Sequence, residues 1–247
     1  MKKLADVIYG VSETQVLDVF LPAGAPTAVF VYFHGGGFVG GDKSKEETYV
    51  SYLTDRGIAV ISANYRMYPN AKYPEFIEDA AQAVAWAYKY AREELNFDKL
   101  YVGGSSAGAY LSMMLCFDRR YLSKVGLDNS VIAGYFHDAG QPTAHFSVLK
   151  YSGIDPRRVI IDETAPLYYI GAEQTYPPMR FIVSDNDIAC RYEQTMLVLS
   201  ALSSFGYAGY DHVVMHGEHV EYCNKLDECG KSVYGRMIYD FIEKCRG

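Results

Sequence analysis

A serine in a glycine-rich pentapeptide is the first residue of this sequence whose setting suggests chemistry. Ser106 lies at the centre of Gly104–Gly108 (GSSAG), which matches the pattern G-x-S-x-G. An apolar run that ends at Val102 precedes it, and a second apolar run begins at Ala107. Glycines at these places allow a tight turn between a strand and a helix, from which the serine hydroxyl would project as a nucleophile. The simpler interpretation is a glycine-rich turn in which Ser106 caps a helix.

A second glycine-rich segment, His34–Phe38 (HGGGF), directly follows the apolar run AVFVYF. Acyl transfer develops negative charge on an oxygen, and each backbone N–H aimed at that oxygen contributes about 3–4 kcal/mol. We expect Gly36, Gly37 and Ala107 to supply such N–H groups as an oxyanion hole. A phosphate-binding loop is the alternative, but no GKS/T sequence or G-x-G-x-x-G helix start follows. His34 itself is expected to anchor the loop rather than to act as a base.

A serine hydroxyl is a weak nucleophile at neutral pH, so a neighbouring base must take its proton. Among six histidines, His219 lies in the expected place, between the last predicted strand and the terminal helix. We therefore assign His219 as the general base. His216 is the second candidate, although it is close enough to the strand end to be structural. His212 is expected to begin that strand.

The base needs a carboxylate that fixes its tautomer and stabilises its protonated form. Asp185 and Asp187 both follow the predicted strand 180–183. We favour Asp187, three residues beyond Ser184, and expect Asp185 to bind amides of the turn. The resulting chain order of serine, acid and histidine is the one used with a nucleophile elbow.

The elements that must position these residues alternate between short apolar runs and longer helical patterns, which is typical of an α/β fold with a mostly parallel sheet. Strands are expected over 16–20, 28–33, 59–63, 99–102, 131–135, 180–183 and 212–215. Helices are expected from residue 74 onward and over 107–117, 191–205 and 222–245. The irregular stretch 119–170 predicts one strand and then a cap insertion over the carboxyl edge of the sheet, where ligands bind in such folds.

Composition indicates one soluble globular domain over 1–247. Hydrophobic residues make up 49% of the chain and charged residues 21%, which suffices for a sheet covered on both faces. The net charge of −7 offers no basic face to nucleic acid and disfavours an anionic membrane surface. No apolar segment has the length of a membrane span, and Asp6 and Gly10 interrupt any signal peptide.

The five cysteines form no CxxC pair, and their number is odd. Free thiols in a reducing cytoplasm are the simplest account of them. Because no cluster of His and Cys has the spacing of zinc ligands, neither a metal nor an organic cofactor is expected. The cysteines are Cys116, Cys190, Cys223, Cys229 and Cys245.

Together these motifs resemble the hormone-sensitive-lipase-like carboxylesterases of the α/β-hydrolase superfamily. Besides HGGGF and GSSAG, the segments 17–22, 64–66, 73–79 and 164–167 resemble that family's pattern, in the same order. The resemblance implies the α/β-hydrolase fold and a serine carboxylesterase that cleaves small, short-acyl esters with Ser106, Asp187 and His219. Two departures are that Ser105 replaces the family's aspartate, and that Val220 follows the histidine where the family has glycine.

Two other functions stay open on the sequence alone. The same triad could cleave an amide, as a formamidase does, because a fold does not determine which bond is cleaved. A non-catalytic binding protein on a hydrolase scaffold is the other alternative, and the complete set of Ser106, Asp187 and His219 argues against it. The expected partner is a small ester, and a homodimer through an edge strand or the terminal helix is a further option.

Overall fold

An eight-stranded sheet forms the frame of the protein in a computed structural model, which describes residues 1–44, 47–173 and 175–247. The strand order across the sheet is β1-β2-β4-β3-β5-β6-β7-β8. Strands β3 to β8 run parallel to one another, whereas β2 is antiparallel to both β4 and β1. The strands are β1 (Lys2–Ile8), β2 (Val16–Leu21), β3 (Ala28–Phe33), β4 (Ile58–Ala63), β5 (Leu100–Ser105), β6 (Ile132–Asp138), β7 (Met179–Asn186) and β8 (Tyr210–Glu218).

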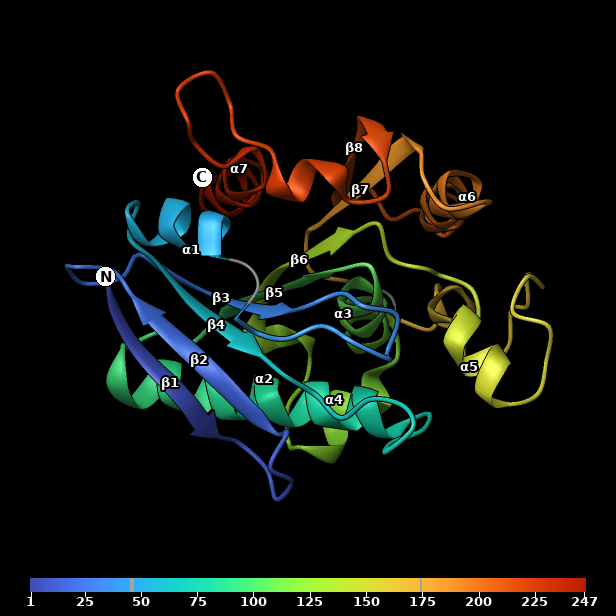
Figure 1. Cartoon of the computed structure of the whole chain (residues 1–247), viewed down its shortest axis with the longest axis horizontal. Coiled ribbons are helices and arrows are strands. Elements are labelled where there is room, and N and C mark those ends of the chain that lie inside the picture. Colours follow the sequence, from blue (N-terminus) through green and yellow to red (C-terminus); the bar gives the residue numbers. More distant parts are fainter. Residues whose placement is uncertain (45–46, 174) are drawn as a thin grey trace.

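Helices cover both faces of this sheet (Figure 1). The apolar cluster on one face includes α2, α3, α4 and α6, and the cluster on the other face includes α1 and α7. The helices are α1 (Glu47–Thr54), α2 (Glu75–Glu94), α3 (Ala107–Phe117), α4 (Arg119–Lys124), α5 (Phe146–Tyr151), α6 (Arg191–Ser204) and α7 (Val233–Arg246), with short 3-10 helices η1 (Asn129–Val131), η2 (Pro166–Tyr169) and η3 (Glu221–Asn224). Helix α5 lies beyond the carboxyl ends of the parallel strands.

The central strands are buried along their whole length. Every residue of β3, β4 and β5 is buried, as their continuous apolar sequences predict for strands covered on both faces. The parallel register sets Phe33 of β3 beside Gly104 of β5, and Ser105 of β5 beside Asp138 of β6. The segments that follow β3, β5 and β6 therefore emerge side by side at the carboxyl edge of the sheet.

The α/β class and the mostly parallel sheet are confirmed, and each predicted strand corresponds to one of β2 to β8 with ends that differ by a few residues. Strand β1 was not among the predictions. Its two lysines and one aspartate hide the alternation of a strand, because β1 is an antiparallel edge strand whose side chains are exposed or only partly buried. Helix α1 was also missed, and its valine, threonines and tyrosines are weak helix formers.

The terminal helix predicted over 222–245 is wrong in its first part. The short helix η3 ends at Asn224, and α7 begins only at Val233. Between them Asp227 accepts hydrogen bonds from the N–H groups of Cys229 and Lys231. Ser232 then caps α7 by accepting from the N–H of Gly235 at 3.0 Å. These polar side chains bind nearby backbone and so favour a turn and a helix start over a continuous helix.

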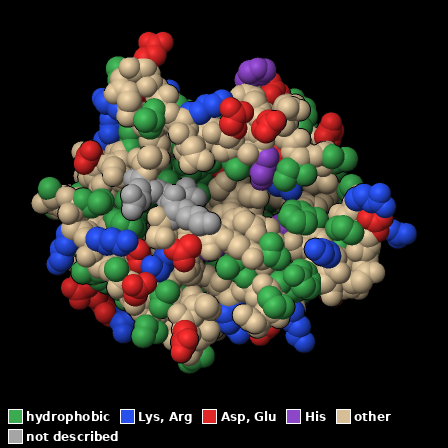
Figure 2. All heavy atoms as spheres, viewed as in Figure 1, with side chains coloured by type: hydrophobic (Ala, Val, Ile, Leu, Met, Phe, Trp, Pro, Cys, Tyr) green, Lys and Arg blue, Asp and Glu red, His purple; other side chains and the backbone are tan. Residues whose placement is uncertain are grey.

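The surface mixes charges of both signs. Figure 2 shows acidic and basic side chains interspersed over one face, with hydrophobic and basic side chains gathered on the side where α5 lies. No helix in the described ranges combines the length and the apolar character that crossing a bilayer requires.

Candidate active site

Ser106 lies on the turn between β5 and α3 in a backbone conformation that side chains rarely adopt, with φ 54° and ψ −112°. Its N–H donates a 2.7 Å hydrogen bond to the carbonyl oxygen of Asp138. Gly108 permits the tight turn, because a Cβ atom there would lie only 1.9 Å from the carbonyl oxygen of Phe33. Ser106 occupies the N-cap position of α3, but its side chain makes no capping hydrogen bond in the described part of the chain.

His219 lies between Ser106 and Asp187. Its Nε2 is 2.9 Å from the Oγ of Ser106, and its Nδ1 is 2.6 Å from an Oδ1 of Asp187. Asp187 directly follows β7 and His219 directly follows β8, so two neighbouring parallel strands deliver both side chains to the same edge. The side chain of Asp187 is fully buried, and that of His219 is 20% exposed. The structure thus brings together the three residues that the sequence suggested for catalysis.

Asp187 is held in its ionised form. Burial acts to raise its pKa, but the hydrogen bond and charge of His219 and the N–H groups of Ile188 and Ser184 lower that pKa below its usual value. A carboxylate can only accept hydrogen bonds, so the proton in its contact with His219 belongs to Nδ1. In the neutral imidazole Nε2 is then free to accept the proton of the Ser106 hydroxyl.

The two other candidates, Asp185 and His216, form a separate pair. Their side chains meet at 2.7 Å, and Asp185 also accepts from the N–H of Gly217 at 3.0 Å. The hydrogen bond with Asp185 raises the pKa of His216, whose side chain is 97% exposed. This pair lies at the surface, whereas His219 and Asp187 are the pair in contact with the serine.

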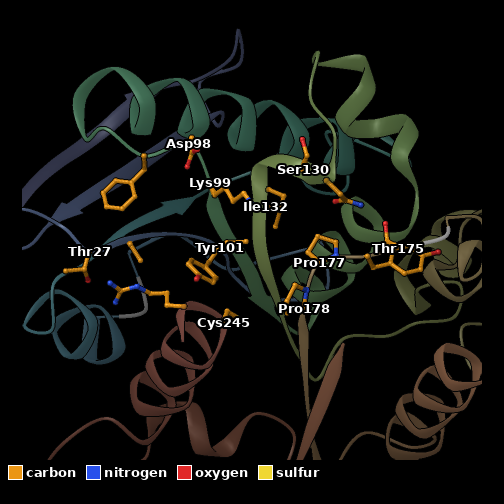
Figure 3. Close-up of a pocket in the computed structure, with 16 residues that line it drawn as sticks. Thr27, Asp98, Lys99, Tyr101, Ser130, Ile132, Thr175, Pro177, Pro178 and Cys245 are labelled. Atoms are coloured by element: carbon orange, nitrogen blue, oxygen red, sulfur yellow. The ribbon is translucent and has the colours of Figure 1, made fainter. Parts of the chain in front are cut away.

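A cavity of about 500 Å³ opens at Ser106. A larger hollow of about 720 Å³ lies at the opposite, amino edge of the parallel strands (Figure 3). Its described lining contains no histidine, so the serine–histidine contact, and not size, identifies the smaller cavity as the candidate site. The smaller cavity is lined by His34, Gly35, Gly36, Gly37, Val39, Gly41, Asp42, Ser105, Ser106, Phe146, Ile188, His219, Val220, Cys223 and Asn224.

The glycine-rich loop forms one wall of this cavity. Gly36 has a φ of 113° and Gly37 a φ of 63°, values that favour glycine. A Cβ atom on Gly36 would lie 2.0 Å from the carbonyl oxygen of Gly40. The carbonyl oxygen of Gly37 accepts a 2.5 Å hydrogen bond from the hydroxyl of Ser147 on α5. The loop is therefore folded in a way that only glycine permits and is held in place from the side of α5.

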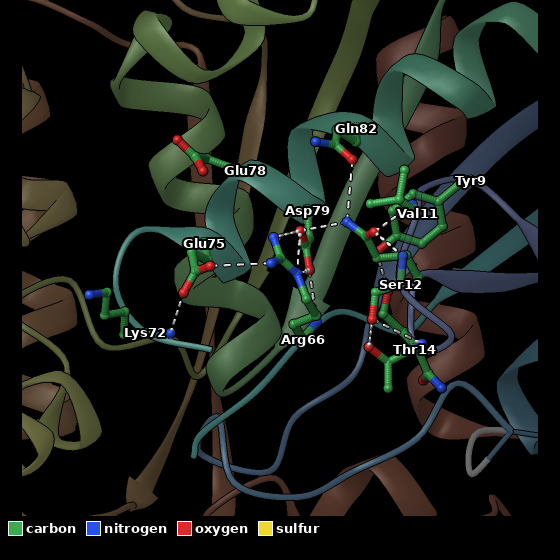
Figure 4. A network of polar contacts seen from close by, with 12 residues as sticks. Tyr9, Val11, Ser12, Thr14, Arg66, Lys72, Glu75, Glu78, Asp79 and Gln82 are labelled. Atoms are coloured by element: carbon green, nitrogen blue, oxygen red, sulfur yellow. Dashed lines mark hydrogen bonds and ion pairs between the residues drawn. The ribbon is translucent and has the colours of Figure 1, made fainter. Parts of the chain in front are cut away.

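His34 supports the loop from behind. The His34 ring stacks on that of Tyr65 with centroids 4.5 Å apart, and the Tyr65 hydroxyl donates a 2.8 Å hydrogen bond to the backbone carbonyl oxygen of His34. The Nδ1 of His34 is 2.7 Å from the carbonyl oxygen of Gly35. The next residue, Arg66, makes a bidentate contact with the buried Asp79 of α2 at 2.7 and 2.9 Å (Figure 4). The loop is thus tied through Tyr65 and Arg66 to the long helix α2.

Asp138, the last residue of β6, is a fully buried acid that the sequence analysis did not single out. Its carboxyl group accepts from the Tyr222 hydroxyl, from the Cys223 thiol at 3.4 Å and from Ser105. Burial raises the pKa of Asp138, and these donors oppose that effect. Ser105, which stands where the family has an aspartate, therefore contacts a carboxyl group supplied by the neighbouring strand. The signal in the sequence that could have revealed Asp138 is a charged residue at the end of an apolar strand.

In the part of the chain that the structure describes, neither the cysteines nor the possible metal ligands form a second candidate site. Among the described residues no two cysteines form a disulfide, and Cys223, whose thiol donates to Asp138, lines the cavity beside His219. Throughout the part of the chain that the structure describes, no group of three His, Cys, Asp or Glu side chains could hold a metal ion.

Comparison with known proteins agrees with this architecture. A family described as having the alpha/beta hydrolase fold matches residues 30–242. The carboxylic ester hydrolase LipN of Mycobacterium tuberculosis is 37% identical over 97 residues, which are 38% of this chain and 26% of that protein. An acetyl esterase of Salmonella schwarzengrund is 32% identical over 97 residues, 38% of this chain and 30% of that enzyme. The matches thus span less than half the length of these curated relatives.

A solved structure extends the likeness to nearly the whole chain. Esterase B from Lactobacillus Rhamnosis superposes with a TM-score of 0.79 over 99% of this chain and 86% of its own, at 18% identity. At that identity the superposition establishes the fold alone. Together with the match over 30–242 it confirms the predicted fold, and the chain belongs to the alpha/beta hydrolase fold family.

Proposed function

We propose that this protein is a serine carboxylesterase in which Ser106 is the nucleophile, His219 the general base and Asp187 the acid that orients it. The observation that carries the proposal is the pair of contacts made by His219, 2.9 Å to the serine Oγ and 2.6 Å to the Asp187 carboxylate. A base within hydrogen-bond reach of a nucleophile, and itself oriented by a third group, is the arrangement that activates a serine. The relatives named as ester hydrolases support the choice of bond.

The first half of the reaction forms an acyl-enzyme. The Ser106 oxygen attacks the ester carbonyl as its proton passes to Nε2 of His219, and the carbonyl oxygen becomes an oxyanion. Backbone N–H groups of Gly36, Gly37 and Ala107 stabilise this oxyanion in our proposal. The C–O bond to the leaving group then breaks, and the imidazolium returns its proton to the departing alkoxide, which leaves as an alcohol.

The second half frees the acid. A water molecule gives a proton to Nε2 of His219 while its oxygen attacks the acyl carbonyl. Collapse of this second tetrahedral state breaks the bond to Ser106, and the proton on His219 passes to the serine oxygen. The ionised Asp187 stabilises the imidazolium in both halves and keeps its ring oriented.

The cavity favours a small substrate with a short acyl chain. Its volume of about 500 Å³ lies within the usual range of small-molecule sites. Apolar contact comes from Val39, Phe146, Ile188 and Val220, which surround the polar groups of the triad. A relative named as an acetyl esterase points to the same class.

We also propose that the chain is one domain and that a short cap lies within 119–170. The first part of this range forms α4, η1 and β6, so the cap would begin after Asp138. Its helix α5 supplies Phe146 to the cavity wall and the Ser147 hydroxyl to Gly37. These contacts support a cap that shapes the cavity on one side.

The test compares Ser106→Ala with the unaltered protein in hydrolysis of 4-nitrophenyl acetate, with circular dichroism and thermal unfolding to verify the fold. We expect turnover to fall to the background rate with the fold unchanged. A fluorophosphonate probe should label the unaltered protein and Ser105→Ala but not Ser106→Ala, which distinguishes the two adjacent serines. Undiminished hydrolysis by a folded Ser106→Ala protein would contradict the proposal.

A further inference from the structure

A smaller cavity of about 200 Å³ lies next to the catalytic cavity, and the two share Phe146 and Ile188 in their walls. Its other lining residues come from the cap segment and from the start of α6. They are Gln141, Pro156, Arg157, Arg158, Val159, Ala189, Cys190, Arg191 and Gln194. A group held in this cavity could therefore belong to the same molecule whose ester bond lies at Ser106.

The wall formed by α6 contains a buried cation. Arg191 is only 3% exposed, and its guanidinium donates to the carbonyl oxygen of Ala139 and, at 3.4 Å, to the Oε1 of Gln141. Among the described residues its hydrogen-bond acceptors are these two neutral oxygens. Burial lowers the pKa of Arg191 to about 10, while the charge of Asp187 acts to raise it. A buried cation bound only by neutral acceptors is costly, and an anion in the cavity would offset that cost.

Two further side chains of this cavity have unused hydrogen-bonding capacity. Gln194 is 8% exposed, and its Oε1 has no hydrogen-bond partner in the described part of the chain. Its amide can rotate so that the NH₂ group donates to a ligand. Arg158 lies exposed at the rim, whereas the charge of its neighbour Arg157 is met by Asp155 at 2.6 Å. The positive charge of the cavity therefore comes from Arg158 and Arg191.

We propose that this cavity is a subsite for a carboxylate that the ester substrate carries, so that the enzyme prefers esters with an acidic group a few bonds from the scissile carbonyl. The inference rests on the proposed esterase function, because it makes Ser106 and the subsite act on one molecule. A guanidinium matches the planar geometry of a carboxylate and binds it through charge-assisted hydrogen bonds. The chain outside this cavity carries an excess of acid, so the preference would come from the cavity and not from the net charge.

The experiment uses two pairs of esters, each differing only by a carboxylate in place of a methyl group. Monoethyl glutarate and ethyl pentanoate place the charge on the acyl side, and 4-acetoxybutyrate and butyl acetate place it on the alcohol side. Acid release is followed by pH-stat titration. We expect kcat/KM to be about tenfold higher for the charged member of one pair. Arg158→Gln and Gln194→Leu should each reduce that preference about three- to tenfold and leave the neutral esters unchanged.

Lys150→Gln is the matched control, because Lys150 is exposed on α5 and lines neither cavity, and its effect on the preference should be below about twofold. An equal loss in Lys150→Gln and Arg158→Gln would reveal long-range attraction and would overturn the subsite, as would equal kcat/KM within both pairs. Calorimetric titration of the Ser106→Ala protein with both pairs of esters tests binding without turnover. If none of the four esters is hydrolysed, the esterase proposal is overturned, and the titration still decides the subsite: tighter binding of the charged member of one pair supports it, and equal binding within both pairs refutes it.

Discussion

The hydroxyl of Tyr222 donates a hydrogen bond to the buried carboxyl group of Asp138. Tyr222 lies in η3, three residues after His219, and Asp138 ends β6 with its carbonyl oxygen bound to the N–H of Ser106 at 2.7 Å. Asp138 therefore joins the segment that carries the proposed base to the turn that carries the proposed nucleophile. We therefore expect the distance between Ser106 and His219 to depend on this connection as well as on the sheet.

Removal of the Tyr222 hydroxyl should weaken both the fold and the reaction. Tyr222→Phe keeps the buried ring but leaves an acceptor of Asp138 without this donor, which typically costs about 1–3 kcal/mol. We expect urea unfolding to show that loss, and kcat for 4-nitrophenyl acetate to fall more than KM rises. Tyr192→Phe on α6, where the tyrosine is 37% exposed, is the control and should change neither quantity. Equal stability of the two variants would contradict the role of the contact.

An aspartate at position 105 should be harmful in this protein although the family carries one there. Ser105 is 5% exposed and contacts Asp138, so a second carboxylate would face the first without a compensating cation. We expect Ser105→Asp to lower the free energy of unfolding by roughly 3–5 kcal/mol. The double variant Ser105→Asp with Asp138→Ser should be more stable than the single Ser105→Asp variant, and a double-mutant cycle measures this coupling. A cycle without coupling would show that the two positions are independent.

Much of the site could be predicted because its residues follow directly from strand ends. Ser106, Asp187 and His219 each directly follow a strand, and parallel strands bring their carboxyl ends to one edge. Asp138 also ends an apolar strand, but its partners could not be predicted, because they depend on the register of β5 and β6 and on where η3 turns back. The helix predicted over 222–245 is interrupted at 225–232, where the side chain of Asp227 binds nearby backbone.

The glycine-rich loop offers a matched pair of substitutions. A Cβ on Gly36 would lie 2.0 Å from the carbonyl oxygen of Gly40, whereas a Cβ on Gly40 would meet no atom within 4 Å. Gly36→Ala must therefore distort the loop and displace its amides, and we expect kcat/KM for 4-nitrophenyl acetate to fall about 100-fold or more. Gly40→Ala should leave kcat/KM within about twofold. A Gly36→Ala enzyme of full activity would exclude these amides from the oxyanion hole.

The raised pKa of Asp138 predicts a specific dependence of stability on pH. A carboxyl group whose pKa is higher in the folded than in the unfolded protein binds its proton more tightly when folded, so its contribution to stability is present at low pH and is lost as the pH rises toward the folded pKa. Asparagine does not titrate. We therefore take the free energy of unfolding of the unaltered protein minus that of Asp138→Asn. This difference should fall as the pH rises above about 4, by up to about 1.4 kcal/mol per pH unit. Urea unfolding of both proteins from pH 4 to 8 measures this difference, and an increase with pH would contradict the assignment.

Asp185 and Asp187 can be separated by the same substitution at each position. Asp187→Asn preserves the shape of the fully buried side chain but allows its NH₂ group to face Nδ1 of His219, which would leave the proton on Nε2 and remove the acceptor for the Ser106 hydroxyl. We expect kcat to fall by about 10³- to 10⁴-fold with KM little changed. Asp185→Asn alters only the exposed contact with His216 and should leave kcat within about twofold. If Asp185→Asn instead caused the larger loss, the orienting acid would be Asp185, and the contact between Asp187 and His219 would have no part in catalysis.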